Sequence, residues 1–144
     1  MMPISHVLYS NDHFIIEHCR SCSVPGYLIV SAREEAGCVS ELKPEAQACL
    51  SPTLSQAARA VRKVIQPDKV YCAQFGEEGR QLHFHVFPRT REITEAFLVE
   101  NPSQRELIHG PVLLDWAREK YNCIDSYEQV GDIIATLQRA ISAT

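Results

Sequence analysis

In the first third of the chain, apolar and polar residues alternate in short runs. These runs read HVLYS, HFIIEHC and YLIVS, and turn-forming residues separate them. Short alternating runs between turn residues are typical of β-strands, so this region predicts a meander of strands. Two later runs, KVYCAQF and QLHFHVFPR, have the same character and are joined by the polar segment GEEGR. They predict two adjacent antiparallel strands.

The spacing of apolar residues becomes helical in two other parts of the chain. Between Leu42 and Ile65 apolar residues recur every three or four positions, as on the buried side of a helix. Pro44 suits the first turn of this helix, whereas Pro52 is expected to bend it or to delay its start. From Asn101 onward the pattern predicts two more helices, one beginning with PVLLDWAREKY and one after DSYE, which resembles a capping box.

Length and composition place these elements in one domain. The 144 residues are enough for a single core but not for two, and no repeat or linker divides them. We therefore predict that residues 1–144 form one domain. The content of 45% hydrophobic and 22% charged residues is that of a folded globular protein rather than a disordered or fibrous one.

Charge, hydropathy and cysteine spacing exclude several functions. A net charge of -4 lacks the basic surplus of proteins that bind the backbones of DNA or RNA. No apolar run approaches the roughly 20 residues of a membrane span, and the first residues do not resemble a secretory signal, so we expect a cytoplasmic protein without a membrane partner. The six cysteines do not have the spacing of a disulfide framework. Cys19 and Cys22 form one CxxC pair, which is half of a tetrahedral zinc site, so no metal is expected.

The run QLHFHVFPR carries the residues of greatest chemical interest. In a strand that ends at the proline, successive side chains point to opposite faces of the sheet. The core face would then carry Leu82, Phe84 and Val86. The other face would carry Gln81, His83, His85 and Phe87. Because a buried imidazole without a hydrogen-bond partner costs about 1–3 kcal/mol, the two histidines are expected to face water or a polar ligand.

Three interpretations of the two histidines compete. They can belong to the solvated face of an antiparallel sheet, or they can share a metal ion. In the third interpretation one imidazole attacks phosphorus while its neighbour stabilises the charge on the phosphoryl oxygens. The glycine-containing segment upstream, together with Arg89 and Arg91 downstream, favours phosphate, because backbone N–H groups and guanidinium groups bind anions.

The same run resembles the signature of the histidine triad (HIT) family, in which histidines alternate with apolar residues and a Pro-Arg pair often follows. Four segments upstream resemble family segments in the same order, namely VLYSNDHFIIEHC, PGYLIVSAREE, SELKPEAQ and VYCAQFGEEG. The resemblance covers residues 6–91, whereas residues 101–144 match no family motif and are interpreted as a variable helical extension. It implies an α+β fold with an antiparallel sheet of about five strands and one main helix.

The resemblance also implies a homodimer that binds a nucleotide at the histidine strand without a cofactor. Family members hydrolyse or transfer nucleoside monophosphates from phosphoramidates or dinucleoside polyphosphates. Their nucleophile is the middle histidine, here His83, and the third histidine, here His85, contacts the phosphate. The further nucleotide-binding positions that the resemblance implies are Leu8, Tyr9, His18, Cys19, Gln74, Gly76, Gln81 and Arg89.

The chain departs from the family pattern at several of these positions. Gln81 replaces the first histidine and cannot titrate near neutral pH, but the backbone carbonyl of residue 81 can still orient the ring of His83. Cys19 replaces an acidic residue and Gln74 replaces an asparagine. Two functions therefore remain open, namely a nucleotide hydrolase or nucleotidyl transferase, and a catalytically weak nucleotide-binding regulator.

Overall fold

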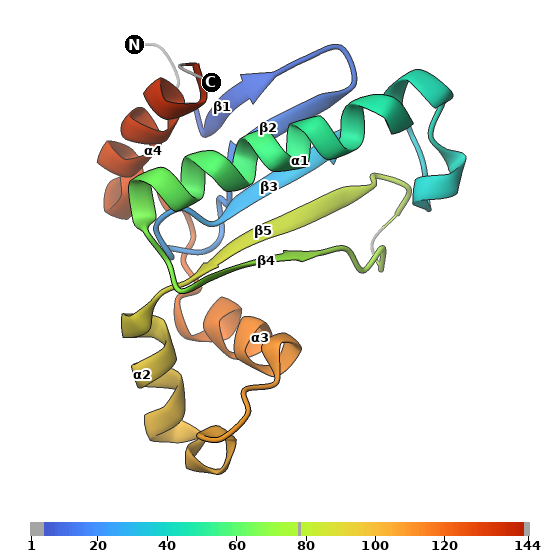
Figure 1. Ribbon diagram of the computed structural model, residues 1–144. Coiled ribbons are helices and arrows are strands. Elements are labelled where there is room, and N and C mark those ends of the chain that lie inside the picture. The colour runs from blue at the N-terminus through green and yellow to red at the C-terminus, as the bar shows by residue number, and fades with distance from the viewer. Residues whose placement is uncertain (1–4, 78, 143–144) are drawn as a thin grey trace.

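The computed structural model describes residues 5–77 and 79–142 and shows an α+β fold built on one antiparallel sheet (Figure 1). The strands are β1 (Val7–Ser10), β2 (Phe14–His18), β3 (Leu28–Ala32), β4 (Lys69–Ala73) and β5 (His83–Arg89). They lie in the order β1-β2-β3-β5-β4, so β5 is an inner strand and β4 is an edge strand. The predicted fold class and the five-stranded sheet are confirmed. Residue 78, in the predicted GEEGR connection, lies outside the described residues.

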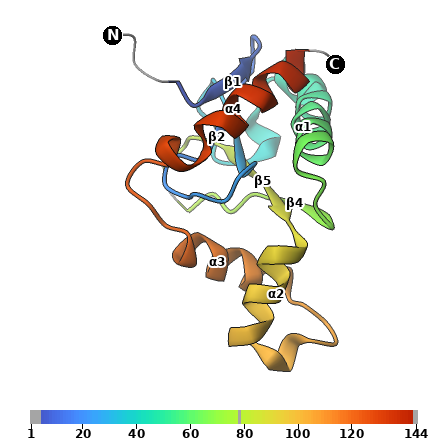
Figure 2. The same ribbon diagram turned by 90° about the vertical axis from the view of Figure 1, so that its left-hand side faces the viewer.

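Four α-helices surround the sheet in the part of the chain that the structure describes. They are α1 (Pro44–Ile65), α2 (Arg91–Glu100), α3 (Gly110–Lys120) and α4 (Tyr127–Ser142). The long helix α1 lies across one face of the sheet, and α4 lies against α1 and β1 (Figures 1 and 2). Helices α2 and α3 contact each other at the end of the sheet where β5 stops (Figure 1). Within residues 5–77 and 79–142, no helix combines the length and the apolar character needed to cross a bilayer.

Helix α1 contains two prolines, and one of them departs from the expectation. Pro44 occupies the first turn, as predicted, but Pro52 does not delay the helix, which runs through it to Ile65. A proline inside a helix removes one backbone hydrogen bond and costs about 3 kcal/mol or more. The buried stripe that includes Ala57 and Val61 extends beyond Pro52, and its burial against the sheet offsets this cost. The helix ends where Gln66 adopts a left-handed conformation with φ of 55°.

The histidine strand begins and ends later than the sequence indicated. It starts at His83, although the carbonyl of Leu82 still accepts a hydrogen bond from the Ala32 N–H at 2.9 Å. It continues through Pro88 to Arg89, so the prediction that Pro88 ends the strand was wrong. The pairing of β5 with β3 stops at Val86, so Pro88 has a partner strand on one side only. Proline is tolerated in such a position because its missing N–H leaves no inter-strand bond unmade.

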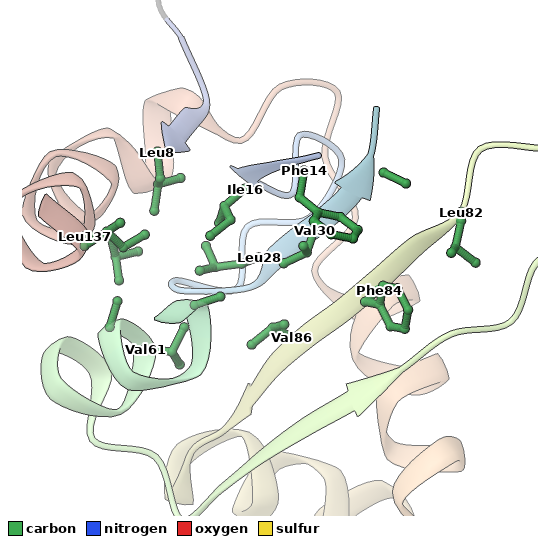
Figure 3. Close-up of a cluster of buried hydrophobic side chains, with 14 of the residues drawn as sticks. Leu8, Phe14, Ile16, Leu28, Val30, Val61, Leu82, Phe84, Val86 and Leu137 are labelled. Carbon is green, nitrogen blue, oxygen red and sulfur yellow. The ribbon is translucent and has the colours of Figure 1, made fainter. Parts of the chain in front are cut away.

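Two apolar clusters lie on opposite faces of β5. The first lies beneath α1 and α4 and is drawn in part in Figure 3. It contains Leu82, Phe84 and Val86, which confirms the predicted core face of the strand. The second cluster contains Phe87 together with buried residues of α2 and α3, such as Phe97 and Leu113. The histidine face of β5 is therefore not uniformly solvated, because α2 and α3 cover the part that carries Phe87.

The tail is an integral part of the core. The two helices predicted after residue 101 are observed as α3 and α4, and α4 buries Leu137 and Ile141 in the first cluster. Helix α2 was missed from the sequence. It begins after Thr90, whose hydroxyl accepts a hydrogen bond from the Ile93 N–H at 3.2 Å, the geometry of an N-cap.

Candidate active site

His83 and His85 border one cavity, where the β4–β5 connection, β5 and α3 meet. The cavity has a volume of about 230 Å³ and is lined by Phe75, Gly76, Glu77, His83, His85 and Arg118. The centres of the two imidazole rings are 5.1 Å apart. A larger cavity of about 420 Å³ lies beside the start of α2, but neither histidine lines it. The smaller cavity is therefore the one with groups that can act on a phosphate.

The ring of His83 is oriented by the backbone two residues earlier. Its Nδ1 lies 3.1 Å from the carbonyl oxygen of Gln81, as the sequence led us to expect. Because a carbonyl oxygen can only accept a hydrogen bond, Nδ1 must carry the proton. The Nε2 atom of the neutral ring then carries the free lone pair. The geometry thus leaves His83 with the nitrogen that a nucleophile needs, and the side chain of Gln81 is not required for it.

His85 is buried, and its ring is bound to a tyrosine. Only 5% of the residue is exposed, and its Nδ1 lies 2.7 Å from the hydroxyl oxygen of Tyr27. Burial lowers the pKa of His85 to about 4, and the positive charges of Arg118 and of a protonated His83 act in the same direction. His85 is therefore neutral at pH 7, and it can act as a hydrogen-bond donor but not as a cation.

Tyr27 and Arg118 were missed from the sequence, as was Phe75, which lines the cavity. Tyr27 precedes β3, and in the sequence it belongs to the run YLIVS, which predicts a strand but no functional residue. Arg118 lies in the last turn of α3, in a segment without a family motif. Its position in a helix was predictable, but the face of α3 that meets the sheet depends on how α3 docks. Arg118 brings a positive charge to a cavity that also contains the acidic residue Glu77.

His18 has a structural position rather than a ligand-binding one. The residue is fully buried, its Nδ1–H donates to the Cys19 carbonyl at 2.9 Å, and its Nε2 accepts the Gly26 N–H at 3.1 Å. Burial lowers its pKa, which favours the neutral ring that this pair of bonds requires. Both ring nitrogens are occupied by the backbone, so neither is free for the nucleotide contact that the resemblance implies.

Arg89 lies at the opposite end of β5 from His83. Six residue steps along a strand correspond to roughly 20 Å. The Arg89 guanidinium donates to the hydroxyl of Tyr71 at 3.3 Å and does not line the histidine cavity. Arg89 therefore lies outside the histidine cavity, whereas Arg118 lines it.

The remaining predicted positions lie on the cavity wall, in a separate hollow or in the core. Gly76 lines the cavity with φ of 73°, and a Cβ atom there would lie 2.9 Å from the side-chain nitrogen of Gln74. The Gln81 side chain lies in a separate hollow beside Arg80. Cys19 packs in the second cluster, and its N–H donates to the carbonyl of Tyr27 at 2.8 Å.

Leu8 and Tyr9 lie on β1, the strand at the far edge of the sheet from β4. Leu8 is buried in the first cluster, and Tyr9 packs against that cluster (Figure 3 shows Leu8). Two strands separate β1 from β5, and neither residue lines the histidine cavity. In the structure both residues pack in or against the core, and their predicted contact with the nucleotide base stays a prediction.

The structure offers little for a metal ion. Within residues 5–77 and 79–142, no three His, Cys, Asp or Glu side chains are grouped to hold one. All six cysteines are free thiols, and Cys22 of the CxxC pair is buried. A histidine pair alone supplies two of the four ligands of a typical zinc site.

Comparison with known proteins agrees with this fold and this histidine strand. The model of the HIT domain matches residues 4–92, which include the whole sheet, α1 and both cavity histidines. The chain belongs to the HIT domain family. No curated protein matches the chain significantly.

Solved structures extend the similarity over nearly the whole chain. A HIT-like protein involved in cell-cycle regulation from Bartonella henselae is 19% identical, with a TM-score of 0.64 over 96% of this chain and 88% of that one. A hypothetical histidine triad nucleotide-binding protein from Sulfolobus tokodaii is 11% identical, with a TM-score of 0.68 over 96% of this chain and 85% of that one. A zinc-bound histidine triad family protein from Mycobacterium smegmatis is 17% identical, with a TM-score of 0.62 over 99% and 90%. At these identities the similarity establishes the fold.

Proposed function

We propose that this protein is a nucleotide hydrolase or nucleotidyl transferase of the histidine triad type. It would act on the α-phosphate of nucleoside phosphoramidates or dinucleoside polyphosphates. The observation that carries the proposal is the hydrogen bond from His83 Nδ1 to the Gln81 carbonyl, which leaves Nε2 unprotonated on a residue that lines the cavity. Membership in the HIT family supports it, and one structural relative is described as a nucleotide-binding protein.

The reaction proceeds in two displacements at the same phosphorus atom. The lone pair of His83 Nε2 forms a bond to phosphorus while the bond to the leaving group breaks, and the leaving group departs with that electron pair. A water molecule then attacks the phosphorus and releases a proton, and the N–P electron pair returns to Nε2. The released proton passes through solvent to the departed leaving group, so the products are the nucleoside monophosphate, the free leaving group and the regenerated imidazole. An alcohol or amine in place of water would give nucleotidyl transfer.

The neighbouring groups stabilise the charge that builds up on the phosphoryl oxygens. Neutral His85 can donate one hydrogen bond from the ring nitrogen that Tyr27 does not occupy. The guanidinium of Arg118 adds a positive charge on the α3 side of the cavity. Because phosphoryl transfer depends mostly on positioning and electrostatic stabilisation, these groups would supply much of the rate.

The test is turnover of two substrates by matched variants. The full chain is incubated with a nucleoside phosphoramidate and with a dinucleoside polyphosphate, and release of the nucleoside monophosphate is measured. His83→Ala should abolish turnover, whereas His109→Ala should retain it, because His109 is exposed and its side chain caps no helix. Mass spectrometry of the rapidly quenched reaction should find one nucleoside monophosphoryl group on His83.

Absence of turnover of both substrates would refute the enzymatic proposal. Nucleotide binding without hydrolysis would favour the alternative function, a catalytically weak nucleotide-binding regulator. The glutamine at position 81 and the carboxylate of Glu77 in the cavity support that alternative. Equal activity of His83→Ala and the unmodified chain would refute the assignment of the nucleophile.

We also infer that the protein works in the cytoplasm as a homodimer. The edge strand β4 has unpaired backbone groups along one side, and such an edge can pair with a second copy. Light scattering after size-exclusion chromatography would measure the mass in solution. A monomer at micromolar concentration would refute the dimer without affecting the proposed chemistry.

A further inference from the structure

We propose that Tyr27 is a positioning residue, which donates its phenolic hydrogen to Nδ1 of His85 and thereby fixes the ring proton on Nε2. This inference deepens the proposed function and rests on it for the catalytic consequence. The hydrogen bond and the tautomer concern the free protein, so they can be tested whether or not the protein turns over a substrate.

The ring of Tyr27 is held rigidly beneath the site. The residue is fully buried, and its ring meets that of Phe87 edge-on, with the centres 5.2 Å apart. Its backbone N–H donates to the Val24 carbonyl at 3.2 Å, and its own carbonyl accepts the Cys19 N–H at 2.8 Å. With the backbone and the ring both restrained, the hydroxyl has little freedom to leave His85.

The direction of the hydrogen bond follows from the burial of the phenol. If the hydroxyl accepted a hydrogen bond from Nδ1–H, its own hydrogen would need another partner. Within the described residues, the hydroxyl is hydrogen-bonded to His85. A buried donor without a partner costs about 1–3 kcal/mol. Burial also raises the pKa of Tyr27, so the phenol keeps its hydrogen. Donation from Tyr27 to Nδ1 is therefore the favoured arrangement.

The consequence for His85 is a fixed role at the cavity. When Nδ1 accepts a hydrogen bond, the single proton of the neutral ring resides on Nε2. Nε2–H can then donate to a phosphoryl oxygen. In the opposite tautomer a lone pair on Nε2 would face the phosphoryl oxygens, and two acceptors repel each other. The tyrosine thus makes His85 a donor, while the backbone carbonyl of Gln81 makes neighbouring His83 a nucleophile.

The two histidines consequently carry opposite tautomers. His83 is protonated on Nδ1 because its partner is a carbonyl, and His85 is protonated on Nε2 because its partner is a phenol. One strand therefore presents a nucleophilic nitrogen and a hydrogen-bond donor side by side.

The variant Tyr27→Phe tests the inference, and Tyr71→Phe is its matched control. Both substitutions remove one hydroxyl from a ring that contacts Phe87, but the Tyr71 hydroxyl binds Arg89 and no histidine. Nuclear magnetic resonance of isotope-labelled histidine distinguishes a protonated ring nitrogen from an unprotonated one. His85→Gln identifies the His85 signals by their loss.

The expected result at pH 7 is a single Nε2–H tautomer for His85 in the unmodified chain and in Tyr71→Phe. Tyr27→Phe should show mixed tautomers, and its kcat should fall in proportion to the fraction of rings in the wrong tautomer, about twofold when the two forms are equally populated, with little change in KM. Tyr71→Phe should keep the kcat of the unmodified chain.

An Nδ1–H tautomer of His85 in the unmodified chain would overturn the inference, whether or not the Tyr27 variant folds. An unchanged His85 tautomer in folded Tyr27→Phe would overturn it as well. If the protein does not turn over any substrate, the proposed function fails while the tautomer measurement still decides the role of Tyr27.

Discussion

The contribution of Arg118 can be isolated by replacing it with methionine. Arg118→Met keeps an unbranched chain like the aliphatic part of arginine. It removes the positive charge from the cavity that holds His83 and His85. The methionine keeps a high helix propensity in the last turn of α3, so the helix should be retained. The change therefore removes charge with little change in structure.

The magnitude follows from the hydrogen bonds that a guanidinium makes with a phosphoryl group. A hydrogen bond to a charged group contributes about 1.5–3 kcal/mol. Arg118 is exposed, so solvent screening places its effect near the lower end of that range. A loss of about 1.4 kcal/mol corresponds to a factor of ten, and we expect kcat/KM to fall roughly tenfold. The pKa of His85 should rise from about 4, because the charge of Arg118 helps to lower it.

Lys120→Met is the matched control. Lys120 lies in the same last turn of α3, so both variants lose one positive charge and the same favourable interaction with the helix dipole. The Lys120 ammonium, however, lies 3.3 Å from the Glu100 carboxylate and does not line the cavity. The assay is steady-state release of nucleoside monophosphate at low and at high salt.

Arg118→Met should lose activity and much of its salt dependence, whereas Lys120→Met should resemble the unmodified chain. Equal losses in both variants would mean that the net charge of the helix matters and that contact in the cavity does not. Full activity in Arg118→Met would refute the role of Arg118 altogether.

Three further predictions follow from other contacts of the described residues. Gln81→Ala should keep kcat/KM within about threefold, because the carbonyl that orients the nucleophile is retained; a hundredfold loss in the same assay would contradict this reasoning. Gly26→Ala should lower the free energy of unfolding in urea by about 2–4 kcal/mol, because φ is 87° and the new Cβ would lie 2.5 Å from Ile65 Cγ1. The control is Gly79→Ala, where φ is 61° and a Cβ would meet open space, so the loss of unfolding free energy should be only about 1–2 kcal/mol. Equal losses in the two variants would mean that the contact with Ile65 contributes nothing. His85 has a folded-state pKa of about 4, below the unfolded value near 6.5, so the stability that its neutral form contributes is complete above about pH 6.5 and is lost as the pH falls toward 4. Urea denaturation should therefore show the unmodified chain losing about 2–3 kcal/mol relative to His85→Gln over this window, and parallel pH profiles would contradict the buried neutral ring.

Much of the fold was predictable because it depends on local periodicity. The alternation in residues 81–87 assigned Leu82, Phe84 and Val86 to the core and both histidines to the other face, and the structure agrees. The stripe of α1 and the two tail helices were equally visible. Helix α2 was missed because it lies in a short segment next to the signature, where its cap at Thr90 was not recognised.

The nearest neighbours of the histidines in the chain were also predictable. The carbonyl of Gln81 lies two residues from His83, so strand geometry alone brings it within reach of the ring. The hydrogen-bond partners of His18 and Arg89 were not predictable in this way. Arg89 lies on the histidine strand and His18 was placed near the site by the family resemblance, but the hydroxyl of Tyr71 and the N–H of Gly26 hold their side chains.

The sequence by itself therefore determined the strand, its two faces and the identity of the two imidazoles, because these follow from the period of a β-strand. The tertiary structure alone decided what surrounds those rings. Tyr27 is 58 residues from His85 along the chain, and Arg118 comes from α3, which packs in the second cluster, whereas α1 packs in the first. Periodicity reports which face of an element is buried but not which segment covers it, and that covering segment sets the proton position on His85 and the charge in the cavity.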